Sequence, residues 1–143
     1  MERAPYFQVY SKAWSLNGNP PVGNGDCVPL VQHYVPSVGH TSSWNPGLRV
    51  MDTVHLPVGT VIATFDKGRY ANKKKGNHAC FFLEYGPISQ TTGKPMFIKV
   101  MDQWIGRKDN AIKWRDIHPR GKSHSDGNPL YDSDNADTFY IVW

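Results

Sequence analysis

The chain has 143 residues, a formal net charge of +4 at pH 7 and hydrophobic side chains at 39% of its positions. These values exclude a disordered polar chain, and because no stretch approaches the roughly 20 apolar residues that span a bilayer, they also exclude membrane insertion. The length suits one compact domain, so we expect residues 1–143 to form a single domain. The basic balance favours anionic partners, among them nucleic acids, acidic lipids and acidic polymers.

The N-terminal part of the chain carries no recognisable targeting segment. The sequence MERAPYFQVY lacks the basic start and the apolar run of a secretory signal peptide. We therefore expect synthesis in the cytoplasm without a cleaved signal, which leaves export by a dedicated secretion machine open. The following segment NGNPPVGNG, residues 17–25, is rich in Gly, Pro and Asn and is typical of a loop.

A helix is predicted to begin directly after Asp26, a favourable N-cap residue. Pro29 is compatible with the first turn, where its missing N–H has no partner to lose, and Pro36 ends the helix. Apolar residues recur between them at helical spacing, and they are Val28, Leu30, Val31, Tyr34 and Val35. The next segment, residues 37–50, is rich in Ser, Gly and Pro and is predicted to be a loop.

Five strands are predicted after the helix, because five segments combine β-branched and aromatic residues and are separated by turn residues. The segments are GTVIATF, NHACFFLEYG, PMFIKVMDQW, AIKWRDI and DTFYIVW. This order predicts an α+β fold, with one helix packed on an antiparallel sheet of about five strands. The polar residues 122–137 are expected to form a surface loop. Four large aromatic residues are assigned to the core, and they are Phe81, Phe82, Trp114 and Trp143.

Cys27 is a candidate nucleophile because of its place at the first position of the predicted helix. Free N–H groups and the helix dipole at this end favour a negatively charged thiolate and lower the pKa of a thiol. The backbone N–H of Cys27 is also expected to help stabilise the oxyanion of a tetrahedral intermediate.

His78 and Asp102 are the candidate partners of this thiol. His78 begins one predicted strand, and Asp102 ends the next one. Strand alternation is expected to turn one polar side chain of each strand toward the helix. An imidazole beside the thiol would act as base and then acid, and a carboxylate on its other nitrogen would hold its orientation.

Four further residues are candidates for binding substrate. Asp26 and Gln103 flank the proposed nucleophile and carboxylate, whereas Trp44 and Trp104 are candidate walls of a cleft. Each has a structural alternative: Asp26 as a helix cap, Gln103 as a surface residue, and the two tryptophans as core residues.

The two cysteines, Cys27 and Cys80, lack the spacing of a zinc site. A disulfide between them remains open and would inactivate the thiol. The sequence contains no HExxH motif, and its histidines are widely spaced, so we expect no metal and no cofactor. A metal-dependent hydrolase remains the less favoured alternative, and its candidate ligands are His33, His40, His55, His78, His118 and His124.

The segments GNGDCVPLVQ, TSSWNPG, GTVIATF, NHACFFLEY and VMDQW resemble the papain-like, CHAP-like cysteine amidases of bacterial cell walls. They are closer still to the small signal-less type VI secretion amidase effectors. The resemblance covers roughly residues 20–117 and implies a papain-like catalytic domain that hydrolyses an amide in peptidoglycan stem peptides or cross-links. It further implies Cys27 as the nucleophile, His78 as the base and Asp102 as the orienting residue.

The resemblance also implies partners and a place of action. We expect peptidoglycan as substrate, a cognate immunity protein, contact with a secretion apparatus, and activity in the periplasm of a target cell. No nucleic acid partner is expected. The alternative is a non-catalytic basic module that binds cell-wall glycan or another anionic polymer. The bond cleaved, and transfer of the acyl group to an amine instead of water, remain open.

Overall fold

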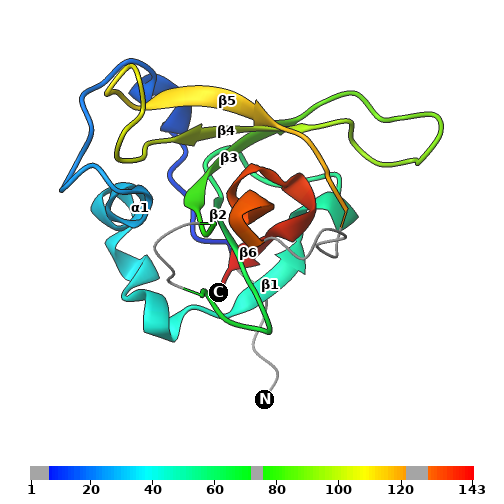
Figure 1. Cartoon of the computed structure of the whole chain (residues 1–143), viewed down its shortest axis with the longest axis horizontal. Helices are drawn as coiled ribbons and strands as arrows, with labels where there is room; N and C mark the ends of the chain where they lie inside the picture. The colour runs from blue at the N-terminus through cyan, green and yellow to red at the C-terminus, as the bar shows by residue number, and fades with distance from the viewer. Residues whose placement is uncertain (1–6, 72–75, 122–128) are drawn as a thin grey trace.

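The computed structural model describes residues 7–71, 76–121 and 129–143 (Figure 1). One α-helix and six strands account for its main regular structure. In chain order they are α1 (Cys27–Tyr34), β1 (Pro46–Arg49), β2 (Val61–Thr64), β3 (Ala79–Tyr85), β4 (Ile98–Asp102), β5 (Lys113–Ile117) and β6 (Phe139–Val142). The helix and the five expected strands are all present, which confirms the predicted α+β fold.

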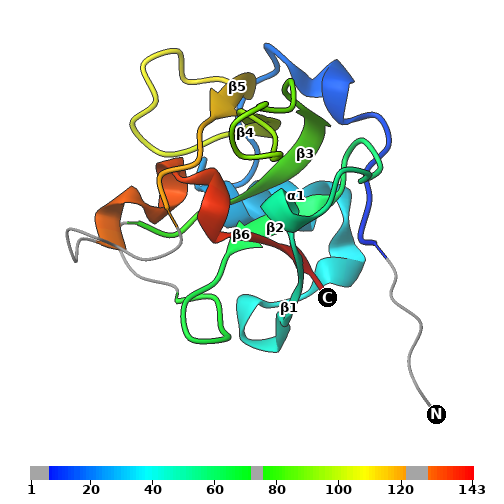
Figure 2. The ribbon, with the colours of Figure 1, turned by 90° about the vertical axis from the view of Figure 1, so that its right-hand side faces the viewer.

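The strands form one antiparallel sheet in the order β1-β6-β2-β3-β4-β5. The C-terminal strand β6 thus inserts between β1 and β2, and Figure 2 shows it in red beside β2. The start of β3 and the end of β4 lie side by side at the same end of the sheet, since the strands are antiparallel and Phe81 pairs with Met101. This arrangement positions the candidate site.

β1 is a sixth strand that lies within the segment expected to be a loop. Its sequence, Pro-Gly-Leu-Arg, has no β-branched residue and no local strand signal. It becomes a strand by pairing with β6 from the far end of the chain. A Cβ atom at Gly47 would lie 2.5 Å from Nε1 of Trp143, so any larger residue here would force the Trp143 ring to move.

Apolar side chains form two clusters, one on each face of the sheet. The first joins Leu30 and Val31 of α1 to Ala79 and Phe81 of β3. The second contains residues that alternate with these along the strands, and it is covered by the 3₁₀ helices Val50–Asp52 and Ala136–Thr138. Figure 1 shows α1 and the orange-to-red segment on opposite sides of the central strands.

Of the four aromatic residues assigned to the core, Phe81 and Phe82 are buried as predicted, but the assignments of Trp114 and Trp143 are wrong. Trp114 is 44% exposed and Trp143 is 40% exposed. Trp114 lies on the edge strand β5 and faces away from the second cluster, with the Lys99 ammonium 3.8 Å from its ring centroid. Trp143 follows the last strand and packs against Gly47.

The expected surface loop at residues 122–137 contains regular structure in its second half. Residues 122–128 lie outside the described part of the chain, but two 3₁₀ helices follow at Pro129–Asp134 and Ala136–Thr138. Across the described ranges, no helix has the length and apolarity needed to cross a bilayer.

Candidate active site

The nucleophile candidate lies at the N-terminus of α1, and the local sequence explains its position. Asp26 has extended backbone angles and caps the helix, with its Oδ1 accepting a hydrogen bond from the Cys27 N–H at 2.8 Å. Cys27 is only 4% exposed. The expected helix start is therefore confirmed, but its first N–H is already bonded to a carboxylate.

Gln103 holds the loop that precedes Cys27. Its Nε2 donates to the carbonyl oxygens of Val22 at 2.9 Å and Asp26 at 2.7 Å, while its Oε1 accepts from the Val22 N–H at 2.9 Å. The side chain is buried, with 1% exposure, which excludes the surface alternative for this residue. It reaches main-chain atoms rather than the cavity, so its position fits a role in placing the loop.

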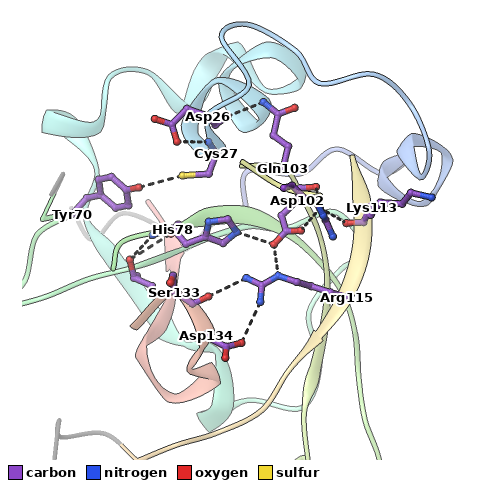
Figure 3. Close-up of polar contacts among 12 residues, drawn as sticks. Asp26, Cys27, Tyr70, His78, Asp102, Gln103, Lys113, Arg115, Ser133 and Asp134 are labelled. Carbon is purple, nitrogen blue, oxygen red and sulfur yellow. Dashed lines mark hydrogen bonds and ion pairs between the residues drawn. The ribbon is translucent and has the colours of Figure 1, made fainter. Parts of the chain in front are cut away.

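His78 and Asp102 form a buried pair at the end of the sheet (Figure 3). The His78 Nε2–H donates to Asp102 Oδ2 at 2.8 Å, and the two residues are 4% and 0% exposed. The ring therefore offers its Nδ1 to Cys27. Both side chains lie on the sheet face of the second cluster, because Cys80 and Val100, which lie two positions away along the same strands and so share their face, belong to it. The expectation that they point toward the helix face is wrong: Cys27 meets His78 across the end of the sheet, and Asp102 lies behind His78.

Two arginines that the sequence reasoning missed surround the carboxylate. Arg107 donates to Asp102 Oδ1 at 3.0 Å, and Arg115 Nε donates to Asp102 Oδ2 at 2.7 Å. The one available sequence signal is alternation along β5, which puts Arg115 on the same face as the buried Ile117. Arg107 comes from the loop after β4, where no periodic pattern exists.

The ionisable groups are tuned in opposite directions by their neighbours. Burial alone would raise the pKa of Cys27, but a hydrogen bond and the positive charge of His78 outweigh it, and the pKa is lowered. Burial would likewise lower the pKa of His78, yet hydrogen bonds to Asp102 and Cys27 raise it to about 9. The pKa of Asp102 is lowered, because hydrogen bonding and charge from His78 and Arg115 outweigh its burial. A thiolate–imidazolium pair beside an ionised carboxylate follows.

Tyr70 and Asn77 complete the surroundings of the thiol, and neither was singled out from the sequence. The Tyr70 hydroxyl lies 3.7 Å from Cys27 Sγ and accepts a hydrogen bond from Asn77 Nδ2 at 3.1 Å. Tyr70 is 6% exposed and its ring packs edge-on against Trp44, with centroids 5.1 Å apart. Both residues belong to the long connection between β2 and β3, where local sequence gives no strand or helix signal.

An open cavity of about 640 Å³ lies above the thiol and the imidazole. Of the four expected substrate-binding residues, Asp26 and Trp104 line it, whereas Gln103 and Trp44 do not. Trp44 is 3% exposed and its Nε1–H donates to the Val38 carbonyl, so it is a core residue that supports Tyr70. The full lining is Asp26, Cys27, Gly76, Asn77, His78, Trp104, Ile105, Arg115, Ser133 and Asp134.

The second cysteine does not share the cavity. Cys80 is fully buried in the second cluster, and both cysteines are free thiols. Burial raises the pKa of the Cys80 thiol, in contrast to Cys27. Within residues 7–71, 76–121 and 129–143, no group of three or more His, Cys, Asp or Glu side chains is arranged to hold a metal ion.

Comparison with known proteins gives consistent matches over nearly the whole chain. Residues 8–142 match the family model described as domesticated amidase effector 2. The chain is 43% identical over 146 residues to a type VI secretion amidase effector 2 protein of Salmonella typhi, with 96% of this chain and 98% of that protein covered. It is also similar to a solved structure of type 6 secretion amidase effector 2 (Tae2), with a TM-score of 0.77, 41% identity, and coverage of 97% of this chain and 94% of that one. The resemblance to type VI secretion amidase effectors is confirmed, and the chain belongs to the domesticated amidase effector 2 family.

Proposed function

We propose that this protein is a cysteine amidase that hydrolyses an amide bond in the peptides of peptidoglycan and serves as an antibacterial effector. The observation that carries the proposal is the meeting of Cys27 with the buried His78–Asp102 pair on the floor of an open cavity. The names of the relatives, which describe amidase effectors of type VI secretion, support the reaction class and the mode of delivery.

In the proposed reaction the Cys27 thiolate attacks the carbonyl carbon of the scissile amide. A C–S bond forms, and the carbonyl π electrons move to oxygen and give a tetrahedral oxyanion. Collapse of this intermediate breaks the C–N bond, and the His78 imidazolium gives its proton to the departing amine nitrogen. The products of this half-reaction are a free amine and an acyl-enzyme.

Deacylation uses the same groups in reverse order. Neutral His78 accepts a proton from water as the water oxygen attacks the thioester carbonyl. The C–S bond then breaks, the thiolate is restored, and a carboxylic acid leaves. Asp102 keeps Nε2 protonated and stabilises the imidazolium throughout, and Arg107 and Arg115 keep Asp102 itself from taking the proton.

The cavity lining supports a peptide rather than a small apolar substrate. Trp104 is 37% exposed, and its ring is held by the Arg107 guanidinium at 4.2 Å. Asp26 and Asp134 add acidic groups on the lining, and Ile105 adds an exposed apolar side chain. We assign Trp104 and Asp26 to substrate contact, whereas Gln103 and Trp44 act by positioning the loop and Tyr70.

The decisive test is mass spectrometry of muropeptides after incubation with the wild-type protein and with Cys27→Ala. We expect new fragments from the wild type, with each pair of product masses summing to the parent mass plus one water, and none from Cys27→Ala. Cys80→Ala is the matched control, because it removes a buried thiol outside the cavity and is expected to retain activity. A product in which the acyl fragment is joined to a second amine, with no net gain of water, would instead indicate acyl transfer. Retained cleavage by folded Cys27→Ala would overturn the proposal.

The proposed place of action is the periplasm of a target cell, with a cognate immunity protein in the producer. The proposal predicts lysis when the chain is directed to the periplasm of a susceptible bacterium and little harm from the same amount in the cytoplasm. Equal toxicity of Cys27→Ala and wild type in the periplasm would favour a non-catalytic binding module instead.

A further inference from the structure

The oxyanion of the proposed reaction needs a hydrogen-bond donor that the helix start does not supply. The Cys27 N–H, expected to fill this role, donates to Asp26 Oδ1 at 2.8 Å. A carboxylate already bound at this N–H would repel a second anion at the same place. The nucleophile's own backbone therefore needs help from another group.

The side-chain amide of Gln103, which holds this loop, is also fully used. Both N–H groups of the Gln103 amide are committed to the carbonyl oxygens of Val22 and Asp26. This residue therefore holds the loop and has no donor left for a substrate oxygen.

Tyr70 is the donor that the structure places beside the thiol. Its hydroxyl lies 3.7 Å from Cys27 Sγ, and Figure 3 shows it on the side of the sulfur away from Asp102. Asn77 donates to the Tyr70 oxygen at 3.1 Å, which occupies one lone pair and leaves the hydroxyl proton free to point elsewhere. The ring is fixed by burial and by its edge-on contact with Trp44.

We propose that Tyr70 is a further catalytic residue, whose hydroxyl, oriented by Asn77, donates a hydrogen bond to the oxyanion formed when Cys27 attacks the substrate carbonyl. This inference rests on the proposed cysteine amidase function. The oxyanion is bonded to the carbon that Sγ attacks, so a donor in contact with Sγ before the reaction lies next to the oxygen after it. No proton is transferred in this step: Tyr70 keeps its proton, and the proton that leaves with the amine comes from His78.

The acid–base character of Tyr70 suits a permanent donor. Burial and the nearby Cys27 charge raise its pKa well above the ordinary value for tyrosine. The hydroxyl therefore remains protonated over the whole pH range in which the thiolate–imidazolium pair exists.

The test uses Tyr70→Phe, which removes the hydroxyl and keeps the ring. Tyr85→Phe is the matched control, because the Tyr85 hydroxyl also makes a hydrogen bond, at 2.8 Å to the Val50 carbonyl, but Tyr85 packs against the second cluster instead of against Cys27. We expect kcat of Tyr70→Phe to fall by about 10²–10³-fold, with KM changed much less, because removal of one oxyanion donor acts on the transition state. Tyr85→Phe should keep the wild-type kcat.

Two further measurements separate oxyanion stabilisation from other roles. Alkylation of Cys27 by iodoacetamide forms no oxyanion, so its limiting rate at high pH should be the same in Tyr70→Phe and wild type. Its pH profile should move to higher pH in the variant, because the Tyr70 hydrogen bond helps to lower the pKa of Cys27. Binding of N-acetylglycinal, whose aldehyde adds to the thiolate as a tetrahedral adduct, should weaken at least about tenfold, since a charge-assisted hydrogen bond is lost. Aldehyde binding tests the role of Tyr70 without turnover of a substrate, so this measurement can also be made if muropeptides are not cleaved.

The outcomes distinguish the two proposals. Muropeptide cleavage by the wild type with an unchanged kcat and aldehyde affinity in Tyr70→Phe would overturn the role of Tyr70 alone. A loss of limiting alkylation rate as large as the loss of kcat in Tyr70→Phe would also overturn it, because the main action of the hydroxyl would then be on the thiolate. A wild type that neither cleaves muropeptides nor binds the aldehyde would overturn both proposals.

Asn77 gives a second, independent variant. Asn77→Asp replaces the donor to Tyr70 by an acceptor, so the hydroxyl proton turns toward the new carboxylate and away from the substrate. We expect Asn77→Asp to lose more kcat than Asn77→Ala, which only frees the hydroxyl. The reverse order would contradict the proposed orientation.

Discussion

The two walls of the cavity beside Cys27 are held by different kinds of interaction. On one side, the loop that leads into α1 is held by Gln103, which is 1% exposed and makes three hydrogen bonds to main-chain atoms. On the other side, the segment Ser133–Asp134 is held by Arg115 and Arg120, with the paired side chains between 22% and 51% exposed. We call these the nucleophile wall and the opposite wall.

This difference follows from the tasks of the two walls. Nucleophilic attack requires the thiolate to be in place before substrate arrives, and buried neutral hydrogen bonds provide a fixed geometry that salt does not screen. Exposed ion pairs contribute little stability and weaken with ionic strength, so they suit a wall that adapts to the substrate. Asp102 joins the two, because it precedes Gln103 in the chain and binds Arg115 of the opposite wall.

The largest effect is expected from Asp102→Ala, which disrupts both walls together. The change leaves Arg107, Arg115 and His78 without their shared carboxylate in a buried site. We expect the free energy of unfolding, measured by urea denaturation, to fall by about 3–5 kcal/mol. Asp52→Asn is the control, since its pairs with Arg49 and Lys94 are 45% exposed on the Asp52 side and should contribute at most about 1 kcal/mol. Similar losses in the two variants would contradict the central role of Asp102.

Gln103→Ala should weaken the nucleophile wall alone. It leaves the N–H and carbonyl of Val22 and the carbonyl of Asp26 without their partner, which costs about 1–3 kcal/mol of unfolding free energy. Because the loop carries Cys27, we expect kcat to fall by about tenfold to hundredfold with a smaller change in KM. A change confined to KM would show that Gln103 acts on substrate binding and not on the position of the thiol.

The pH profile of kcat/KM reports on the ion pair between Cys27 of the nucleophile wall and His78. The imidazolium is the acid in the proposed acylation, and the pKa of His78 is raised to about 9, so activity should fall as pH rises through about 9. The pKa of Cys27 is lowered, so activity should fall on the acid side only below the ordinary pKa range of a thiol. Asp102→Asn removes a charge that raises the pKa of His78, and it should therefore move the basic limb to lower pH. A basic limb that does not move would place Asp102 outside the titrating unit.

The smallest effect is expected from Asp134→Asn in the opposite wall. It removes ion pairs to Arg115 at 3.2 Å and Arg120 at 2.7 Å, and we expect less than about 1 kcal/mol of lost stability. KM should rise by a few-fold, and the difference from wild type should shrink near 1 M salt, where the Debye length is about 3 Å. A loss of kcat as large as that of Gln103→Ala would remove the distinction between the two walls.

The features that the sequence predicted correctly are those encoded by near neighbours in the chain. Asp26, Pro29 and Pro36 define the start and end of α1 through capping and a missing N–H. Alternation of apolar residues marked the strands that carry His78 and Asp102, so their proximity to each other and to Cys27 was a reasonable expectation. The catalytic roles of these residues stay predictions until the variants are measured.

The features that escaped prediction depend on contacts between segments that are distant in the chain. β1 exists because β6 returns to pair with it, and Arg107 and Arg115 meet Asp102 only once β4 and β5 are in register. The same holds for Tyr70, which an irregular connection brings to the thiol, and for Ser133–Asp134, which become part of the cavity through Arg115.

The sequence by itself thus determined the class of fold, the helix that presents Cys27, and the chemical types of the reacting groups. Because capping, proline geometry and strand periodicity act over a few residues, they can be recognised in a single sequence. Only the tertiary structure decided which groups surround the thiol and carboxylate, because charge neutralisation and donor orientation depend on distances that long-range packing sets.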